Sequence, residues 1–358
     1  MPALPVPVGV THGWRLADLP RPAADAPKVM TTFCGAGGSS MGYKLAGCNV
    51  IIANDIDPDM GGIYQRNLHP ETFLSGPVCD LVTGDLPEQA YNLDILDGSP
   101  PCSAFSTQGL REKTWGKETH FREGQAVQVL DDLFFDFVAL ANRLQPKVVV
   151  AENVAGLVKG NAKGYAREVV MQLTQAGYDV QLFRIDAQHV GVPQTRDRVF
   201  FVGRHRRMGW PPLQLSTAEF TRTTFWDACS DLNIPAEDYR KISGAMGLRM
   251  WQERRPGENT MNKASVRLRG KEGHFGRTII EYNKPLPCIT AGSSIVHSDR
   301  PVHIHTREIS RCGTFPDDYD FGNVKPMYAV GMSVPPFLSR FVASHVVTQW
   351  LSPATATG

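Results

Sequence analysis

The sequence predicts an α/β fold, in which a parallel sheet is built from alternating strands and helices and a small domain of a different kind is inserted. From residue 28 to about 203, short apolar runs alternate with longer helical stretches, which is typical of a parallel sheet. After Gly203 this rhythm ends, Gly and Pro become frequent, and basic residues cluster. With 358 residues, 42% of them hydrophobic, the chain can bury one large core and a smaller one.

The expected strands, in chain order, are 29–33, 50–54, 93–96, 148–151, 180–185 and 199–202. The expected helices between them are 41–46, 58–67, 125–144 and 164–176. A final helix, 336–351, is apolar on most faces and should pack back onto the sheet. We therefore expect four segments, namely a loosely ordered proline-rich arm (1–27), a large domain in two parts (28–208 and 301–358), and a small domain of irregular or β-rich structure (209–300).

Cysteine usage and hydropathy limit the class of protein. The seven cysteines are odd in number and contain no Cys-x-x-Cys spacing, which argues against a disulfide framework and a structural zinc site. The N-terminus lacks the pattern of a secretory signal, and no run of about 18 apolar residues occurs. We expect a cytoplasmic protein of a reducing compartment, without a metal or a membrane segment.

Charge is unevenly distributed along the chain. Residues 241–284 contain ten Lys or Arg and four Glu, although the whole chain has a net charge of only +1. Such a cluster in an otherwise acidic chain fits contact with a phosphate backbone, and it equally fits a solvated charged face.

A glycine-rich turn follows the first expected strand, in the stretch Phe-Cys-Gly-Ala-Gly-Gly that ends at Gly38. The full dinucleotide fingerprint is not met, because its third glycine would fall at Ser40. Asp55 ends the second expected strand, 20 residues after Gly35, where α/β folds place a carboxylate for ribose hydroxyls. Asp80 is a candidate acceptor for an exocyclic amine or a helix cap. With no phosphate signature, the ligand expected is a nucleoside such as S-adenosyl-L-methionine.

The stretch Gly-Ser-Pro-Pro-Cys places one thiol, Cys102, just after an apolar run that ends at Asp97. Two consecutive prolines fix φ and force the chain out of the sheet in a rigid turn, at the edge where open α/β sheets bind ligands. A buried cysteine that acts as a small hydrophobe is the alternative reading.

A carboxylate and two guanidinium groups are expected at the same edge. Glu152 ends the expected strand 148–151, and Arg196 and Arg198 enter the next one, where alternation directs both to one side of what we expect to be a parallel strand. Arginines on one buried face need anions or polar partners. The alternative for Glu152 is a carboxylate held by structural partners.

These motifs together resemble those of DNA (cytosine-5)-methyltransferases of bacterial or phage type. The matching stretches occur in the family's order between residues 30 and 340, and they read FCGAGG, the acid of NDID, GSPPCSAFS, AENV, QTRDR, IHTREISRCGTFPD and GMSVPP. The resemblance implies a Rossmann-like class I methyltransferase sheet with a target-recognition domain, and an enzyme of DNA methylation and restriction-modification.

The resemblance also implies residue roles. Cys102 would be the nucleophile that adds to carbon 6 of cytosine, Glu152 would hold ring nitrogen 3 and the exocyclic amine, and Arg198 would donate to the carbonyl oxygen with Arg196 beside it. Residues implied to bind S-adenosyl-L-methionine are Phe33, Gly35, Gly37, Gly38, Asp55, Ile56, Asp80, Leu81, Pro100, Met332 and Ser333. The chain departs from the family at Met332, where Asn is usual, and at Asp55, where Glu is common. We expect the first departure to change the tolerance of the pocket near the sulfonium.

Double-stranded DNA is the implied partner, bound by a monomer, and the target cytosine must leave the duplex stack to be attacked. The segment 106–123 is expected to close over the flipped base, and 209–300 to recognise the target. Candidate DNA contacts are Ser106, Arg249, Arg254, Arg255, Arg267, Arg269 and Lys271.

Two alternative functions remain open. A transfer-RNA cytosine-5 methyltransferase resembles this family in fold and motifs, but the basic insert and the absence of a Cys-Phe-Thr signature argue against it. A catalytically silent DNA-binding relative would lack Cys102 or Glu152, and both are present.

Overall fold

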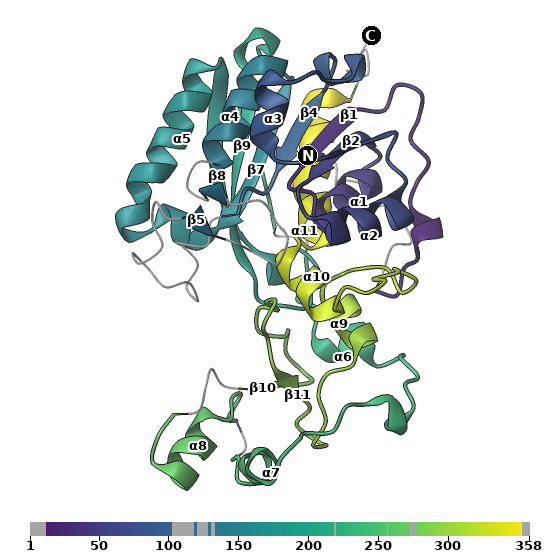
Figure 1. The fold of residues 1–358 in the computed structure, drawn as a ribbon, viewed down its shortest axis with the longest axis vertical. Coiled ribbons are helices and arrows are strands. Elements are labelled where there is room, and N and C mark those ends of the chain that lie inside the picture. The colour runs from purple at the N-terminus through teal and green to yellow at the C-terminus, as the bar shows by residue number, and fades with distance from the viewer. Residues whose placement is uncertain are drawn as a thin grey trace.

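The computed structural model describes residues 12–101, 118–119, 128–129, 133–217, 220–255, 257–272 and 277–352. Its centre is a seven-stranded sheet with the strand order β3-β2-β1-β4-β7-β9-β8 (Figure 1). The strands are β1 (Lys28–Thr32), β2 (Asn49–Asp55), β3 (Thr72–Ser75), β4 (Ile95–Gly98), β7 (Val148–Val154), β8 (Tyr178–Asp186) and β9 (Asp197–His205). All neighbouring pairs are parallel except the two that involve β9.

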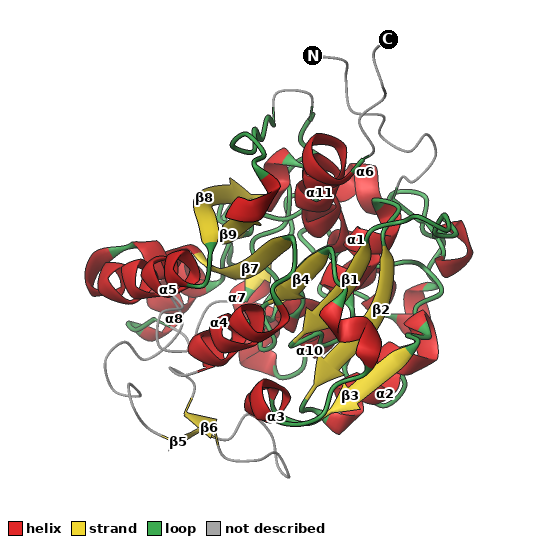
Figure 2. Cartoon of the chain, turned by 90° about the horizontal axis from the view of Figure 1, so that it is seen from above, coloured by secondary structure: helices red, strands yellow, loops and turns green. Residues whose placement is uncertain are grey.

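Helices cover both faces of this sheet (Figure 2). One face packs against α1 (Gly38–Leu45), α2 (Pro58–Leu68) and α11 (Pro336–Val346), and the other against α3 (Val78–Thr83), α4 (Leu133–Leu144) and α5 (Lys163–Gln175). Because side chains alternate along a strand, Val29 lies in the first core and Met30 in the second. Both faces are therefore buried, which explains the continuous apolar runs of the central strands.

The expectation that Arg196 and Arg198 lie on a parallel strand is wrong, because β9 runs antiparallel to both of its neighbours. Only residues 187–196 connect β8 to β9, and this connection contains one 3₁₀ turn, Ala187–His189. A parallel crossover needs a dozen or more residues, so a connection this short reverses the chain. As a result, the start of β9 lies at the same edge as the ends of β4 and β7.

The other expected strands are confirmed, with ends that differ by up to three residues. The sequence did not indicate β3, a short strand whose residues are only half-buried or exposed. The helix expected from residue 125 begins at Leu133, and residues 128–129 instead form β6 (Gln128–Val129), which pairs with β5 (Glu118–Thr119). The expected closing helix is confirmed as α11, which continues into a π turn, Val347–Leu351.

The segment 209–300 contains α6 (Phe225–Cys229), α7 (Ala245–Gln252) and α8 (Asn262–Arg269). Its strands in the described residues are β10 (Thr278–Ile279) and β11 (Ile295–Val296). The described part of the segment is therefore irregular and not rich in β-structure. A small separate core consists of Ile242, Met261, Ile279 and Val296. The boundaries at 209 and 300 stay a prediction.

The expected N-terminal arm is anchored through one side chain, although most of its described residues are exposed. Trp14 is 3% exposed, and its indole N–H donates to the carbonyl of Thr314 at 3.0 Å. Two further helices, α9 (Thr306–Cys312) and α10 (Pro326–Met332), precede α11. No helix among the described residues combines the length and the apolar character needed to cross a membrane.

Candidate functional site

The glycine turn lies between β1 and α1, at the carboxyl edge of the sheet. Phe33 and Gly35 both adopt left-handed backbone conformations, with φ of 52° and 51°. The Gly35 N–H donates to Asp55 Oδ2 at 2.7 Å, so the acid at the end of β2 holds the turn in place. No heavy atom of the described residues lies within 4 Å of the position where a Cβ of Gly35 would stand.

Asp55 is held by backbone donors on both oxygens. Besides Gly35, the N–H of Asp57 donates to Asp55 Oδ1 at 2.8 Å. Burial raises the pKa of Asp55 to about 6, and the two backbone donors act in the opposite direction. The neighbouring Ile56 is half-buried. A carboxylate fixed in this way lies where the ribose contact was expected.

The start of α1 packs closely against a segment from the far end of the chain. A Cβ on Gly38 would lie 2.1 Å from the Val334 carbonyl oxygen, so only glycine allows this approach. Gly37, with φ of 75°, is the N-cap of α1. The Ser333 hydroxyl donates to the Ala329 carbonyl at 2.8 Å, so it is engaged within α10.

Met332 and Asp80 are the most accessible of the expected donor contacts. Met332 is 45% exposed, although it is a large apolar side chain. Asp80 is exposed in the first turn of α3, and that helix is preceded by Pro77 with no side-chain cap. The alternative of a capping role for Asp80 is therefore not supported. The adjacent Leu81 is buried in the core of the α3 face.

Glu152 and Arg198 form the charged centre of the site. Arg198 Nε lies 2.8 Å from Glu152 Oε1, and Glu152 is 7% exposed. The N–H is not aligned with the oxygen, so this contact is an ion pair, and Oε1 is left buried without a hydrogen bond in the described structure. Such a buried oxygen has acceptor capacity for a further partner.

Arg196 directly precedes β9, which begins at Asp197. Its guanidinium is buried and donates to the carbonyls of Ile289 and Gly331, at 3.0 and 3.2 Å. Burial lowers the pKa of Arg196 to about 10, and the charge of Arg198 acts in the same direction, whereas that of Glu152 opposes it. Arg196 thus joins two distant segments next to the Glu152–Arg198 pair.

Asn153 fixes the turn that leads to the expected nucleophile. Its Nδ2 donates to the Pro100 carbonyl at 3.0 Å, and its Oδ1 accepts from the Val154 N–H at 2.8 Å. Its role was not predicted from the sequence, although its position directly after Glu152, in the stretch Ala-Glu-Asn-Val, was a usable signal. Cys102 and Ser106 lie outside the described residues.

A second carboxylate that the sequence analysis did not assign lies beneath this turn. Asp97, the next-to-last residue of β4, is 3% exposed and accepts hydrogen bonds from Thr31, Ser39 and Tyr43. The hydroxyl of the following Ser99 is buried without a partner in the described structure.

The basic residues of the small domain fall into two groups. The guanidinium of Arg254 donates to the Trp251 and Ser298 carbonyls and stacks on the Trp251 ring at 3.9 Å, and Arg267 pairs with Glu258 at 2.7 Å. Arg254 is half-buried in these contacts, whereas Arg267 is exposed and pairs with Glu258 at the surface, so both have partners within the domain and their contact with DNA stays a prediction. The remaining candidates are exposed, namely Arg249, Arg255, Arg269 and Lys271.

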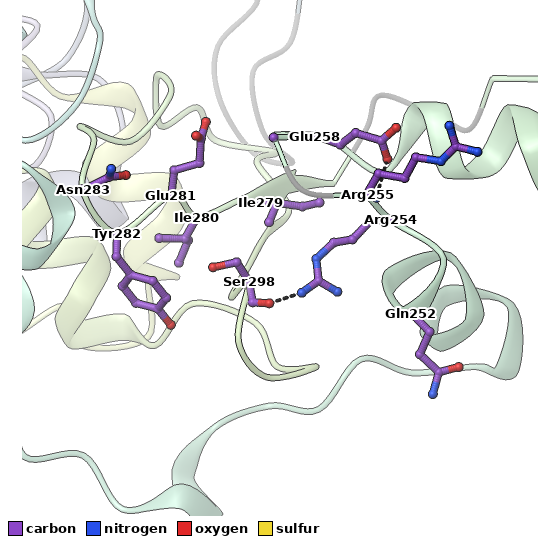
Figure 3. Close-up of a pocket in the computed structure, with 11 residues that line it drawn as sticks. Gln252, Arg254, Arg255, Glu258, Ile279, Ile280, Glu281, Tyr282, Asn283 and Ser298 are labelled. Atoms are coloured by element: carbon purple, nitrogen blue, oxygen red, sulfur yellow. Dashed lines mark hydrogen bonds between the residues drawn. The ribbon is translucent and has the colours of Figure 1, made fainter.

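An open cavity of about 540 Å³ lies between residues 252–258 and 279–283 (Figure 3). Figure 3 shows the Arg254 guanidinium directed toward Ser298 at its centre. Burial lowers the pKa of Arg254, which is typical of a group packed into a protein wall. Among the described residues, no group of three or more His, Cys, Asp or Glu side chains is arranged to bind a metal ion.

The sheet order with one antiparallel strand, the glycine turn after β1 and the acid at the end of β2 define a Rossmann-like class I methyltransferase. A family model described as C-5 cytosine-specific DNA methylase matches residues 28–348. The chain belongs to this family, and the expectation of an enzyme of DNA cytosine-5 methylation is confirmed.

Relatives of this chain are named type II methyltransferases. M.FnuDI of Fusobacterium nucleatum is 23% identical over 348 residues, which cover 89% of this chain and 94% of the relative. M1.HphI of Haemophilus parahaemolyticus is 27% identical, with 88% and 85% covered. M.NgoPII of Neisseria gonorrhoeae is 32% identical over 49% of this chain and 47% of its own length.

Solved structures share the fold. A candidate DNA modification methyltransferase encoded within an Escherichia coli prophage has a TM-score of 0.65 and 20% identity, with 90% of this chain and 99% of that chain covered. Spodoptera frugiperda DNMT2 has a TM-score of 0.64 and 16% identity, with the same coverage.

Proposed function

We propose that the protein transfers a methyl group from S-adenosyl-L-methionine to carbon 5 of a cytosine in double-stranded DNA, with Cys102, Glu152 and Arg198 as the groups that act on the base. One observation carries the proposal. The buried Glu152, in an ion pair with Arg198, keeps an oxygen that accepts no hydrogen bond from the described residues. Glu152 stands on the same strand end as Asn153, which holds the Pro100 carbonyl two residues before Cys102.

The residues at the ends of β1, β2 and β4 fit a nucleoside methyl donor. Among the described residues, none occupies the space where a Cβ of Gly35 would stand. Asp55 is held in place as a hydrogen-bond acceptor, and Asp80 is exposed shortly after the end of β3. The contacts we propose are Phe33, Gly35, Gly37, Gly38, Asp55, Ile56, Asp80, Leu81, Pro100, Met332 and Ser333. The side chain of Ser333 is engaged by Ala329, so its contribution would come from the backbone.

The reaction needs cytosine made nucleophilic at carbon 5. S-adenosyl-L-methionine, when bound, supplies an electrophilic methyl group. The Cys102 thiolate adds to carbon 6, and the ring electrons move toward nitrogen 3. Glu152 holds that nitrogen and the exocyclic amine and favours protonation there, while Arg198 donates to the carbonyl oxygen. Carbon 5 then takes the methyl group while the donor leaves as a neutral thioether, and a base removes the carbon-5 proton so that the thiolate is expelled.

In this proposal, Arg196 acts by keeping the site assembled. Its bonds to the Ile289 and Gly331 carbonyls hold the segment before Met332 against the loop that follows Leu286. Removal of its guanidinium would release two buried carbonyls at once, each at a cost of about 1–3 kcal/mol.

DNA would be bound through the exposed cations of the small domain. Arg249, Arg255, Arg269 and Lys271 have no acidic partner among the described residues, so they remain available for phosphates or guanine edges. The cytosine must be extruded, because carbon 6 is inaccessible in the stacked duplex. A monomer is proposed, since the donor and base sites both derive from one chain.

The test is covalent trapping. Duplex DNA with 5-fluorocytosine has no removable proton at carbon 5, so incubation with S-adenosyl-L-methionine should leave a stable adduct that maps to Cys102. Cys102→Ser should form none, and Glu152→Gln should form it about 100-fold more slowly or worse. Adduct formation with RNA but not with DNA would support the transfer-RNA alternative. No adduct with either would support a silent DNA-binding protein.

A further inference from the structure

Asp97 is a buried carboxylate that the proposed reaction does not use. Its Oδ2 accepts from Ser39 Oγ at 2.7 Å and from Thr31 Oγ1 at 3.0 Å, and its Oδ1 accepts from Tyr43 Oη at 3.0 Å. In the described part of the chain no Lys, Arg or His forms an ion pair with it. The charge is therefore stabilised by three neutral hydroxyl groups alone.

The fold itself does not require a charge at this place. An ionised carboxylate is costly to bury without a cation, whereas an apolar residue in the middle of a sheet is not. Burial raises the pKa of Asp97 to about 6 although all three hydroxyls favour the ionised form, and the charge of Glu152 also raises it. Side chains that break the rule for buried charges in this way are expected at functional positions.

The carboxylate connects the two loops on which the proposed reaction depends. Ser39 is the second residue of α1, directly after the glycine turn, and Asp97 stands directly before Gly98 and the Pro-Pro-Cys stretch. The backbone is equally confined, because the Thr32 hydroxyl donates to the Asp97 carbonyl at 3.1 Å. A Cβ on Gly98 would lie 2.6 Å from that hydroxyl oxygen, so only glycine lets the end of β4 lie this close to β1.

We propose that Asp97 is a positioning residue, whose three hydroxyl hydrogen bonds lock the helix after the donor turn to the loop that carries Cys102. The lock keeps the separation between the methyl donor and the attacking thiol constant during the reaction. The expected effect on the methylation rate rests on the proposed function. The expected effect on the local structure rests only on the hydrogen bonds of Asp97. A displacement of about 1 Å between reacting groups can reduce the rate about 100-fold.

Two substitutions separate the hydrogen bonds from the charge. In Asp97→Asn, the amide oxygen can still accept from Thr31 and Ser39, and the amide N–H can donate to Tyr43, whose hydroxyl both donates and accepts. Asp97→Ala removes the acceptor for all three hydroxyls. We expect kcat to fall about 100-fold in Asp97→Ala and less than about threefold in Asp97→Asn. Donor and DNA Kd should change less than about threefold in both.

Tyrosine variants provide a second pair that retains the carboxylate. Tyr43→Phe removes one of the three donors, and we expect kcat to fall about 10-fold. Tyr178→Phe is the matched control, because Tyr178 is equally buried, and its hydroxyl bonds the Pro146 carbonyl at 3.0 Å at the opposite edge of the sheet. This control should leave kcat unchanged.

The pH profile separates a lock made of hydrogen bonds from one that needs the charge. A protonated Asp97 presents an O–H donor and an accepting oxygen, as the amide of Asp97→Asn does, so its titration near pH 6 should leave the lock intact. Titratable groups that interact with it are Glu152, Tyr43, Cys34 and Tyr64; burial raises the pKa of the last three well above this range, so they stay neutral. The wild type and Asp97→Asn should therefore show the same acidic limb in kcat, and a limb near pH 6 in the wild type alone would contradict a lock made of hydrogen bonds.

Hydrogen exchange of the unliganded protein tests the lock without any catalysis. Amides of residues 39–45 and 95–101 should exchange at least about 10-fold faster in Asp97→Ala than in Asp97→Asn or the wild type. Unchanged exchange in both segments would overturn the inference, even if the protein proved not to methylate DNA. So would wild-type kcat in both Asp97→Ala and Tyr43→Phe, or a loss of kcat in Asp97→Asn as large as in Asp97→Ala.

Discussion

Replacement of Asn153 by alanine tests whether the strand that carries Glu152 also sets the position of the nucleophile loop. The substitution removes two hydrogen bonds, one to the Pro100 carbonyl and one from the Val154 N–H. Each neutral bond contributes about 1 kcal/mol, and the buried Pro100 carbonyl left without a donor costs about 1–3 kcal/mol more. The expected decrease in the free energy of unfolding is therefore about 3–5 kcal/mol.

Such a loss is smaller than the total stability of a typical domain, so the variant should remain folded. The measurements are urea unfolding and single-turnover methylation at saturating donor and DNA. We expect the rate of methylation to fall by up to about 100-fold, because the Pro100 turn is no longer tied to the end of β7. Asn153→Asp, which retains the acceptor for Val154 but removes the donor to Pro100, should show most of this kinetic effect.

Asn67→Ala is the matched control. Asn67 is 7% exposed, donates to the carbonyls of Ile63 and Asp320, and accepts from the Asp320 N–H at 2.9 Å, so it makes the same kinds of bond away from the site. It should lose a similar free energy of unfolding with no change in the methylation rate. Equal methylation rates in Asn153→Ala and Asn67→Ala would refute the positioning role of Asn153. An unchanged free energy of unfolding in Asn153→Ala would show that its two hydrogen bonds do not stabilise the fold.

Three further predictions follow from other contacts. Gly38→Ala places a Cβ 2.1 Å from the Val334 carbonyl oxygen, so we expect donor affinity, measured by calorimetry, to fall at least about 10-fold, and wild-type affinity would contradict this packing. Arg255→Ala should weaken DNA binding and reduce its salt dependence in a binding titration, whereas Arg254→Ala should mainly lower the thermal midpoint of unfolding. The reverse pattern would make Arg254 the DNA contact and Arg255 the structural residue. Burial raises the pKa of Asp97 from 3.8 to about 6, so its contribution to stability is present below about pH 4 and is lost as pH rises to 6. The stability of the wild type relative to Asp97→Asn should accordingly decrease by about 3 kcal/mol from pH 4 to pH 7 in urea titrations, and a constant difference would exclude this titration.

Much of the site could be predicted because the family's motifs lie at strand ends, and parallel strands bring their carboxyl ends to one edge. This reasoning correctly brought Asp55 to the glycine turn and Glu152 to the side of Arg198. It did not show that the Arg196 guanidinium bonds carbonyls of two distant segments. Charge composition likewise does not reveal that the Arg254 guanidinium already has internal partners.

The sequence by itself determined the alternation of strands and helices, the chemical identity of the groups at the strand ends and the family to which they belong. These features depend on local periodicity and on short motifs, which are written in consecutive residues. Only the tertiary structure decided that β9 is antiparallel, that Asn153 holds Pro100, and that Asp97 joins α1 to the end of β4. Each of these depends on contacts between segments distant in the chain, whose partners are chosen by packing and by the satisfaction of buried polar groups.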